Sequence, residues 1–209
     1  MKIVGPSVEL LWITPEPEKQ IEQSGRTCYK SEDRITEGSA NEFCRKMVRS
    51  GHHAMLEHAS ASFRIVCDRG VSHEIVRHRI VSYAQESTRY CNYSKDKFDS
   101  VITVIEPPGL TGITYETWRL SCIDAEENYF ILLDEGISPQ IARSVLPTCL
   151  KTEIIMTANF REWRHFIKLR AAKAAHPQIR PIAADVWKVL NHHSSSAFVD
   201  LEKDINYGH

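Results

Sequence analysis

The sequence lacks several patterns that mark common functional classes. None of its nine glycines forms a G-x-G pair, so the glycine-rich dinucleotide fingerprint and the phosphate-binding P-loop are both missing. The six cysteines contain no C-x-x-C pair, which argues against zinc ribbons and thioredoxin-like redox sites. No serine lies in a G-x-S-x-G elbow, so a hydrolase triad has no support. Side chains must therefore hold any dinucleotide cofactor.

Long apolar runs and an excess of one charge are also missing. The longest apolar run, 129–133, is far shorter than the roughly 20 residues of a bilayer span. The first residues lack the apolar core of a signal peptide, so a cytoplasmic protein with reduced, mostly buried thiols is expected. Lys and Arg number 26 against 27 Asp and Glu, a net charge of −1. That balance argues against a protein that coats nucleic acid, although local basic pockets stay possible.

The composition is that of an ordinary globular protein. Hydrophobic residues make up 42% and charged residues 25% of the 209 residues, which excludes a disordered chain. We find no internal repeat, low-complexity tract or Gly/Ser linker, so residues 1–209 are predicted to form a single domain. Long helical patterns alternate with few strands and without a βαβ rhythm. This order favours an α+β fold with a mixed or antiparallel sheet packed against several helices.

Periodicity predicts the individual elements. Strands are expected within residues 2–14, interrupted at Gly5-Pro6, and over 60–68, 101–105 and 152–160. Helices are expected over 15–30, 37–49, 70–80, 115–134, 161–175 and 179–193. Residues beyond Ser82 look extended as far as Tyr90, so that alternate side chains project to opposite sides.

Two histidine-containing patterns raise the question of a metal site. The run 73–77 (HEIVR) is one residue from the H-E-x-x-H zincin motif, but Arg77 replaces the second ligand and a cation cannot bind zinc. His52, His53 and His58 cluster with Glu57, and such a cluster could hold a metal. Packing and hydrogen bonding near a site are the commoner roles of such histidines. We therefore predict no metal site.

The most informative segment is 77–90, RHRIVSYAQESTRY. In the predicted helix Glu74 would share a face with Arg77 and His78, because residues three and four apart are neighbours. Farther along, an amide, a hydroxyl and a guanidinium alternate at Gln85, Ser87 and Arg89. This set suits a polar ring that carries a phosphate, since arginine offers paired, planar donors to phosphate oxygens.

R-H-R followed after seven residues by Ser87 resembles the signature of the flavin-dependent thymidylate synthases. Further blocks occur in the family's order, at 25–31 (GRTCYKS), 51–60 (GHHAMLEHAS), 142–147 (ARSVLP) and 159–170 (NFREWRHFIKLR). Two positions depart from the pattern. Ala84 replaces the Asn of some members, and Ala174 replaces a histidine of many, for which His176 could substitute.

The resemblance implies reductive methylation of dUMP to dTMP. Methylenetetrahydrofolate would donate the carbon, reduced FAD the hydride, and NADPH would re-reduce the flavin. It also implies a homotetramer with shared active sites. The implied FAD-binding residues are His52, Arg77, His78, Arg79, Gln85, Asn159, Arg161 and His165. The implied dUMP-binding residues are Glu74, Arg77, Gln85, Ser87, Arg89, Arg143 and Arg170.

The resemblance assigns Arg170 to polarising the uracil ring, and the chemistry of arginine fits that role. Carbon 5 of the ring must become electron-rich, so negative charge that develops on the N3–O edge needs stabilisation. Arginine stays protonated and can act only as an electrostatic partner. Trp163, Phe166 and Ile167 form an adjacent apolar stripe, whose low polarity strengthens the interaction. Arg161, His165 and Lys168 form a separate stripe suited to cofactor phosphates.

Ser87 is predicted to bind substrate by a hydrogen bond, because no base lies beside it to activate a nucleophile. Two alternatives stay open. Transfer of the carbon without the final reduction would give a 5-hydroxymethylpyrimidine nucleotide through the same contacts. A non-catalytic nucleotide- or RNA-binding protein could use the basic segments 77–89 and 161–170, although the net charge weighs against it.

Overall fold

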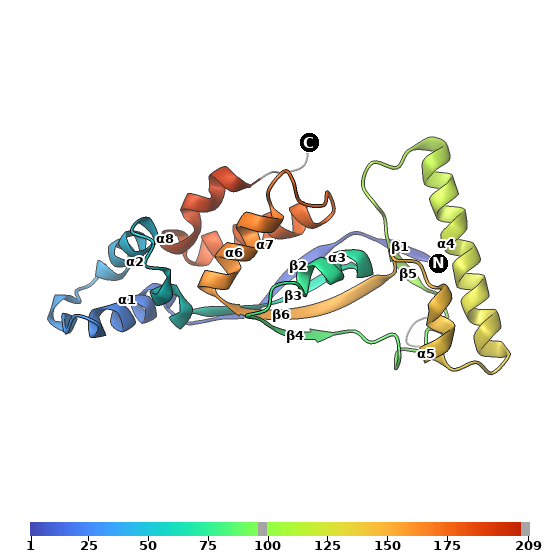
Figure 1. Ribbon diagram of the computed structural model, residues 1–209, viewed down its shortest axis with the longest axis horizontal. Coiled ribbons are helices and arrows are strands. Elements are labelled where there is room, and N and C mark those ends of the chain that lie inside the picture. Colours follow the sequence, from blue (N-terminus) through green and yellow to red (C-terminus); the bar gives the residue numbers. More distant parts are fainter. Residues whose placement is uncertain (96–99, 206–209) are drawn as a thin grey trace. The chain divides into compact units, whose positions relative to one another are not determined.

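The computed structural model describes residues 1–95 and 100–205, and its elements are drawn in Figure 1. The chain forms two compact units, which we describe separately. Unit 1 comprises Met1–Ser7, Val66–Arg77 and Ala84–Ile154, and unit 2 comprises Val8–Ile65, His78–Tyr83 and Ile155–His209. No helix in the described part of the chain is both long and apolar enough to span a bilayer. The single domain over residues 1–209 stays a prediction.

Unit 1 is built around its longest helix. Strands β1 (Lys2–Val4) and β5 (Thr103–Ile105) pair in parallel. The helices are α3 (Arg69–Ile75), α4 (Gly112–Asp134), α5 (Pro139–Ala142) and the 3₁₀ turn η4 (Arg143–Val145). A core of buried residues, including Val104, Tyr129 and Leu150, packs beneath α4. The Thr111 and Thr114 side chains form a capping box that fixes where α4 begins.

Unit 2 is mainly helical. It holds β2 (Ser7–Ile13), α1 (Pro17–Thr27), α2 (Ser39–Arg49), α6 (Phe160–Arg170), α7 (Ile179–His193) and α8 (Ser195–Phe198). It also holds the 3₁₀ segments η1 (Glu32–Arg34), η2 (His53–His58) and η5 (Val199–Asp204). Helix α6 packs against η2 and α7, while α8 contacts both α2 and α7 (Figure 1). The α6–η2 contact brings two blocks of the family pattern together.

A four-stranded sheet has the order β2-β3-β6-β4. Its members beyond β2 are β3 (Ser60–Asp68), β4 (Ser82–Gln85) and β6 (Lys151–Asn159). Alternate residues of β6 are buried, from Thr152 to Ala158, as the period of a half-buried strand predicts. A parallel strand pair, an antiparallel bridge between Val104 and Leu150, and long helices occur together. The predicted α+β fold class is confirmed.

Three predicted boundaries are wrong. The helix expected over 70–80 ends at Ile75, and the buried His78 side chain bonds to Glu162 and Arg170 of α6 instead of lying on a continuation of α3. Glu74, Arg77 and His78 therefore do not share a helical face. The extended stretch ends at Gln85, since the Ser87 carbonyl accepts the N–H groups of Tyr90 and Cys91 in a turn.

The helix expected to reach Ala175 ends at Arg170, although alanines follow it. Ala171 is fully buried at the end of α6. Tertiary packing overrides the local helix propensity at this position.

Candidate active site

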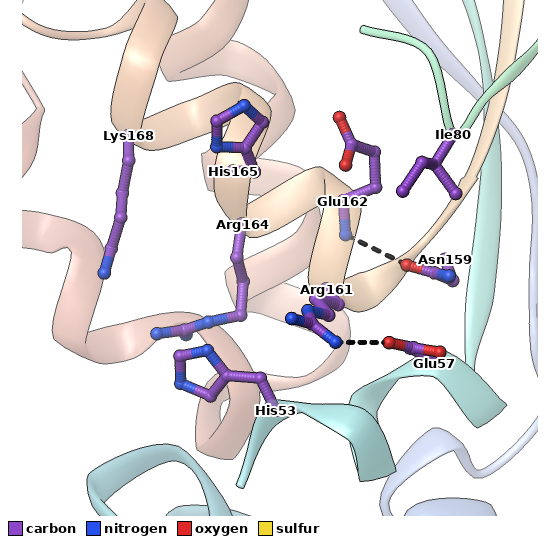
Figure 2. A pocket seen from close by; sticks show the side chains of 9 residues that line it. All are labelled: His53, Glu57, Ile80, Asn159, Arg161, Glu162, Arg164, His165 and Lys168. Carbon is purple, nitrogen blue, oxygen red and sulfur yellow. Dashed lines mark hydrogen bonds and ion pairs between the residues drawn. The ribbon is translucent and has the colours of Figure 1, made fainter. Parts of the chain in front are cut away.

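Unit 2 contains a cavity of about 490 Å³ beside α6. Residues from α6, η2, the end of β6 and the loop before β4 line it, as Figure 2 shows. The lining residues are His53, Glu57, Ile80, Asn159, Arg161, Glu162, Arg164, His165 and Lys168. The lining therefore includes the predicted stripe of Arg161, His165 and Lys168 and the predicted cofactor residue Asn159.

Asn159 and Arg161 have fixed positions at the start of α6. The Asn159 side-chain oxygen accepts the backbone N–H of Glu162 at 2.9 Å, the contact of a helix N-cap (Figure 2). Arg161 Nη1 lies 2.6 Å from Glu57 Oε1. Both side chains of this pair are about half-exposed, so the ion pair orients the arginine while contributing less than about 1 kcal/mol.

Arg164 lines the cavity but has a mainly structural role. It forms a two-pronged ion pair with Asp200, with both N–O distances 2.7 Å, and also donates to the Ala197 carbonyl. Burial alone would raise the pKa of Asp200, but the Arg164 guanidinium lowers it below its usual value. Burial and the nearby Arg164 charge lower the pKa of His53. Arg164 thus ties η5 to α6 and, together with burial, favours the neutral form of His53.

His78, the central residue of R-H-R, is the most enclosed polar residue of the predicted site, with 3% of its surface exposed. Its Nδ1 lies 3.0 Å from Glu162 Oε1, and Arg170 Nε donates to its Nε2 at 3.2 Å. The His78 ring also packs edge-on against Phe166, at 5.1 Å between centroids. These contacts join the signature segment to the later block, across 92 positions of the sequence.

The surroundings of His78 favour its neutral form. Burial lowers the pKa of His78, the hydrogen bond to the Glu162 carboxylate opposes this shift, and the Arg170 charge reinforces it. Tyr83 donates its hydroxyl to the His78 carbonyl at 2.8 Å, and burial raises the pKa of that hydroxyl to about 12. Imidazole and phenol both stay uncharged near neutral pH.

His78, Glu162 and His165 are also close enough to form a metal site, with candidate ligand atoms all within 4.8 Å. However, Arg170 already donates to one His78 nitrogen and Glu162 contacts the other. The adjacent guanidinium cation opposes a second cation at this position. Hydrogen bonding therefore explains this cluster.

Unit 1 holds the predicted substrate residues around β4. The Gln85 amide donates to Ser72 Oγ at 2.9 Å and Thr152 Oγ1 at 3.2 Å. Both acceptors are buried, on α3 and β6. The Gln85 side chain is therefore held at two points, which fixes the orientation of its carbonyl oxygen.

The turn after β4 brings three more predicted substrate residues together. Arg143 Nη1 donates to Thr88 Oγ1 at 2.9 Å, which places Arg143 beside Ser87 and Arg89. The hydroxyl of Ser87 accepts a long hydrogen bond, 3.4 Å, from the Arg89 backbone N–H. This contact involves no base that would activate a nucleophile.

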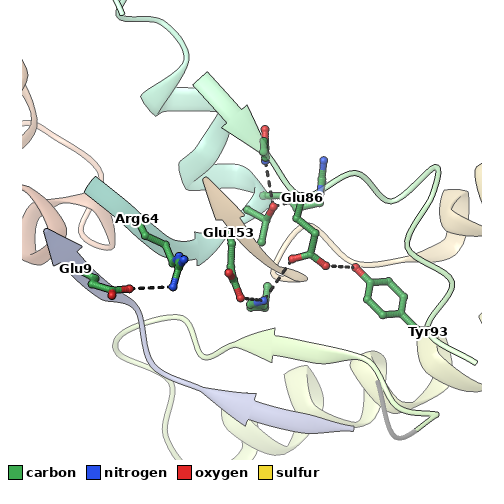
Figure 3. Close-up of polar contacts among 9 residues, drawn as sticks. Glu9, Arg64, Glu86, Tyr93 and Glu153 are labelled. Atoms are coloured by element: carbon green, nitrogen blue, oxygen red, sulfur yellow. Dashed lines mark hydrogen bonds and ion pairs between the residues drawn. The ribbon is translucent and has the colours of Figure 1, made fainter. Parts of the chain in front are cut away.

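A further polar network in unit 1 lies beside the signature segment. Lys151 contacts Glu153 and, at 3.3 Å, Glu86, which in turn accepts the Tyr93 hydroxyl (Figure 3). Burial alone would lower the pKa of Lys151, but both carboxylates raise it above its usual value. This network fixes the backbone just before Ser87. In unit 2, Figure 3 also shows an exposed ion pair between Glu9 and Arg64.

Some predicted residues lie outside these groups. Arg77 and Arg79 are exposed, and Glu74 is half-buried. His52 borders a different hollow of unit 2, about 730 Å³ in volume, with Arg26, Phe43 and other residues. Its neighbour His53 lines the cavity beside α6 instead. His176, the possible substitute for the histidine missing at Ala174, accepts the Gln178 N–H through Nδ1 just before α7.

Sequence reasoning missed Glu57 and Glu162 as site residues. Glu162 follows the cap residue Asn159 by three positions, which is the ordinary capping pattern and signals no function. Only the fold brings its carboxylate to His78. Glu57 did appear in the histidine cluster, but nothing in the sequence indicated its pairing with Arg161.

Known proteins share both the fold and the sequence blocks. The structure resembles the UMP/dUMP methylase PolB from Streptomyces cacaoi, solved bound with 5-Br dUMP. The TM-score is 0.81, the identity is 24%, and the match covers 97% of each chain. At that identity the likeness supports the fold alone.

Sequence relatives identify the family. A family model described as thymidylate synthase complementing protein matches residues 9–193. The flavin-dependent thymidylate synthase of Geobacter sulfurreducens is 34% identical over 206 residues, covering 92% of this chain and 85% of that protein. That of Mycolicibacterium vanbaalenii is 34% identical over 202 residues, covering 87% and 78%. The chain belongs to the flavin-dependent thymidylate synthases, a family of enzymes.

Proposed function

We propose that this enzyme methylates dUMP to dTMP, with methylenetetrahydrofolate as carbon donor, reduced FAD as hydride source and NADPH as the reductant of the flavin. The observation that carries the proposal is the hydrogen bond from Arg170 to buried His78. It joins the two blocks to which the resemblance assigns flavin contact and uracil polarisation. The relatives' names and the substrate analogue held by PolB support the same substrate class.

The residues around the cavity fit the phosphate part of FAD. Arg161 and Lys168 supply cationic donors, while Asn159 and His165 supply further polar groups. Arginine and lysine are the side chains that bind phosphate oxygens most strongly in proteins. We assign FAD binding to these four residues, together with His78, Arg79, Gln85, Arg77 and His52 from the family pattern. FAD, when bound, supplies the hydride.

Arg170 is the residue assigned to the chemistry on the pyrimidine. Its guanidinium is permanently charged, and it would stabilise negative charge on the N3–O edge as carbon 5 becomes nucleophilic. Fully buried Phe166 and Ile167 lie four and three positions before it on α6. Low polarity beside the guanidinium strengthens its interaction with developing charge.

The unit 1 residues are assigned to holding the nucleotide. Gln85, whose amide is held at two points, offers its carbonyl oxygen to the uracil edge. Arg143, oriented by Thr88, and Arg89 offer guanidinium groups to the phosphate. Ser87 adds a neutral hydrogen bond, and Glu74 and Arg77 complete the set from the family pattern.

We further propose that the active enzyme is a cytoplasmic homotetramer with shared sites. Exposed apolar residues on α4 support association. Ile113, Leu120 and Ile131 are 79%, 52% and 58% exposed. Spacings of seven and eleven residues place them on one helical face. An exposed apolar row of this kind is typical of an interface.

The proposal is tested with purified protein and defined additions. The protein should take up FAD and become yellow, and dUMP should then change the flavin absorbance. Formation of dTMP should require dUMP, methylenetetrahydrofolate, FAD and NADPH, each omitted in turn. Protein that fails to take up FAD, or that binds polynucleotide much more tightly than dUMP, would contradict the proposal. Polynucleotide binding should be measured at several salt concentrations, since contacts to nucleic-acid phosphates weaken steeply with salt.

A further inference from the structure

Glu162, His78 and Arg170 form a continuous hydrogen-bonded chain within unit 2. The Glu162 carboxylate lies 3.0 Å from His78 Nδ1, and Arg170 Nε lies 3.2 Å from Nε2 on the other side of the ring. The His78 side chain is 1% exposed and that of Glu162 is 12% exposed. Solvent therefore has little access to the contact, and each partner of the ring is a specific protein group.

The protonation pattern of the chain follows from the chemistry of its members. Arginine has only donors, so Arg170 Nε–H donates and His78 Nε2 must carry a lone pair. A neutral imidazole then has its proton on Nδ1, which points at the carboxylate. Glu162 accepts the hydrogen bond from Nδ1–H. It thereby favours the tautomer whose Nε2 can accept from Arg170 Nε–H.

We propose that Glu162 is a positioning residue for the catalytic arginine, fixing the His78 tautomer so that Nε2 orients the Arg170 guanidinium. The inference rests on the proposed role of Arg170. It extends that role to a residue that the family pattern did not single out. Glu162 itself need not touch the substrate.

The position of Glu162 is itself fixed by the fold. Its backbone N–H donates to the Asn159 side chain, so the Glu162 backbone is held in the first turn of α6. Arg170 ends the same helix two turns later. The groups that face His78 are Glu162, His165 and Arg170 from α6 and Tyr83 from β4. Among these, the Glu162 carboxylate is the anionic acceptor for Nδ1–H.

The sharpest test is a double-mutant cycle with Glu162→Gln and Arg170→Lys. Glutamine has the same shape but its amide can donate to Nδ1 and stabilise the wrong tautomer. Glu162→Gln should lower kcat about tenfold to a hundredfold, since a misplaced catalytic group costs this much, with KM for dUMP changed less than about threefold. In the Arg170→Lys enzyme, Glu162→Gln should lower kcat by less than about threefold, because the guanidinium that Glu162 helps to position is already absent.

Three further variants complete the experiment. Glu162→Asp keeps the charged acceptor and should recover part of kcat. Glu9→Gln makes the same chemical change in an exposed ion pair of unit 2 and should leave kcat unchanged. His78→Asn identifies the His78 signals in ¹⁵N-histidine spectra. These spectra should show the Nδ1–H tautomer in the wild type and its loss in Glu162→Gln, without reference to activity.

The outcomes separate this inference from the proposed function. Three results would overturn the positioning role. These are an equal loss of kcat from Glu162→Gln in the wild-type and Arg170→Lys enzymes, a change in KM for dUMP without a change in kcat, or a His78 tautomer that Glu162→Gln leaves unchanged. Wild-type protein that shows the Nδ1–H tautomer but forms no dTMP would overturn the proposed function and leave the tautomer assignment standing. Thermal unfolding of each variant shows whether it remains folded.

Discussion

Arg170 and Ser87 make different kinds of contact, and this difference predicts different defects. Arg170→Ala removes a charge that would act most strongly in the transition state, so turnover should fall by about 10²–10³. Arg170→Lys should recover little, because a single ammonium does not reproduce the guanidinium fork. Ser87→Ala removes a neutral hydrogen bond worth roughly 0.5–1.5 kcal/mol, so it should cost about tenfold or less, mostly in dUMP affinity.

The measurement is dTMP formation with saturating dUMP and reduced flavin, together with a flavin absorbance spectrum of each variant. Both variants should keep their flavin. An inactive Ser87→Ala enzyme beside a nearly normal Arg170→Ala enzyme would invert the two roles. A serine nucleophile would then have to be reconsidered, despite the long 3.4 Å contact of its hydroxyl.

Buried His78 makes stability depend on pH. Burial lowers its pKa below the ordinary 6.5 in the folded protein, whereas the unfolded chain titrates near that value. The unfolded state therefore binds more protons just below pH 6.5. The contribution of neutral His78 is fully present above pH 6.5 and is lost as the pH falls toward the folded pKa, and His53 acts in the same direction.

Urea unfolding at several pH values checks this expectation. The free energy of unfolding should decrease as the pH falls below 6.5, and His78→Gln should make the decrease smaller. A free energy that rises over this interval, or a slope unchanged by His78→Gln, would contradict the assigned protonation state.

At the scale of elements, the start of α6 combines a structural and a binding role in Asn159. Asn159→Ala removes the cap and should destabilise the apoprotein by about 1 kcal/mol. Asn159→Asp keeps an equally good cap, so stability should be nearly unchanged. Its new charge lies in the cavity assigned to cofactor phosphates and should weaken FAD binding.

Urea unfolding of the apoprotein and titration with FAD separate the two roles of Asn159. If the aspartate variant loses as much stability as the alanine variant, the cap contact does not stabilise the helix. If it binds FAD as tightly as the wild type, the phosphates lie elsewhere.

The elements with strong periodicity could be predicted from the sequence, and the ends of several could not. The strand over 60–68 is found with the same bounds, and β6 and α4 are close to expectation. The predicted helix through R-H-R was wrong beyond Ile75. The spacing of its apolar and charged residues fits a helix, but His78 is buried against α6, where its partner Glu162 lies 84 positions away. No local pattern contains that information.

Some residues of the candidate site could also be predicted from the sequence, and others could not. Resemblance identified Arg170 and His78, and helical spacing identified the Arg161, His165 and Lys168 stripe that lines the cavity. The contact between His78 and Glu162 spans 84 positions and depends on where α3 ends. Glu162 alone looks like an ordinary helix-start glutamate, so its neighbourhood could be recognised only in the fold.

The proposed shared sites require that several copies of the chain assemble. Sedimentation at micromolar concentration should give a homotetramer. Leu120→Lys places a charge in the exposed apolar row of α4, half-exposed in the single chain, and should shift the enzyme to smaller species. Ser121→Lys, one position away on the same helix, serves as a control outside that row. A fully active wild-type monomer would contradict shared sites.

The mass of the nucleotide product identifies the reaction that the enzyme performs. Purified enzyme with FAD, NADPH, methylenetetrahydrofolate and dUMP should yield a nucleotide in which a methyl group replaces one hydrogen of the ring. Arg170→Ala should form it at least a hundredfold more slowly. A product that carries a hydroxymethyl group, or dUMP recovered unchanged from flavin-loaded wild-type enzyme, would contradict reductive methylation by this enzyme.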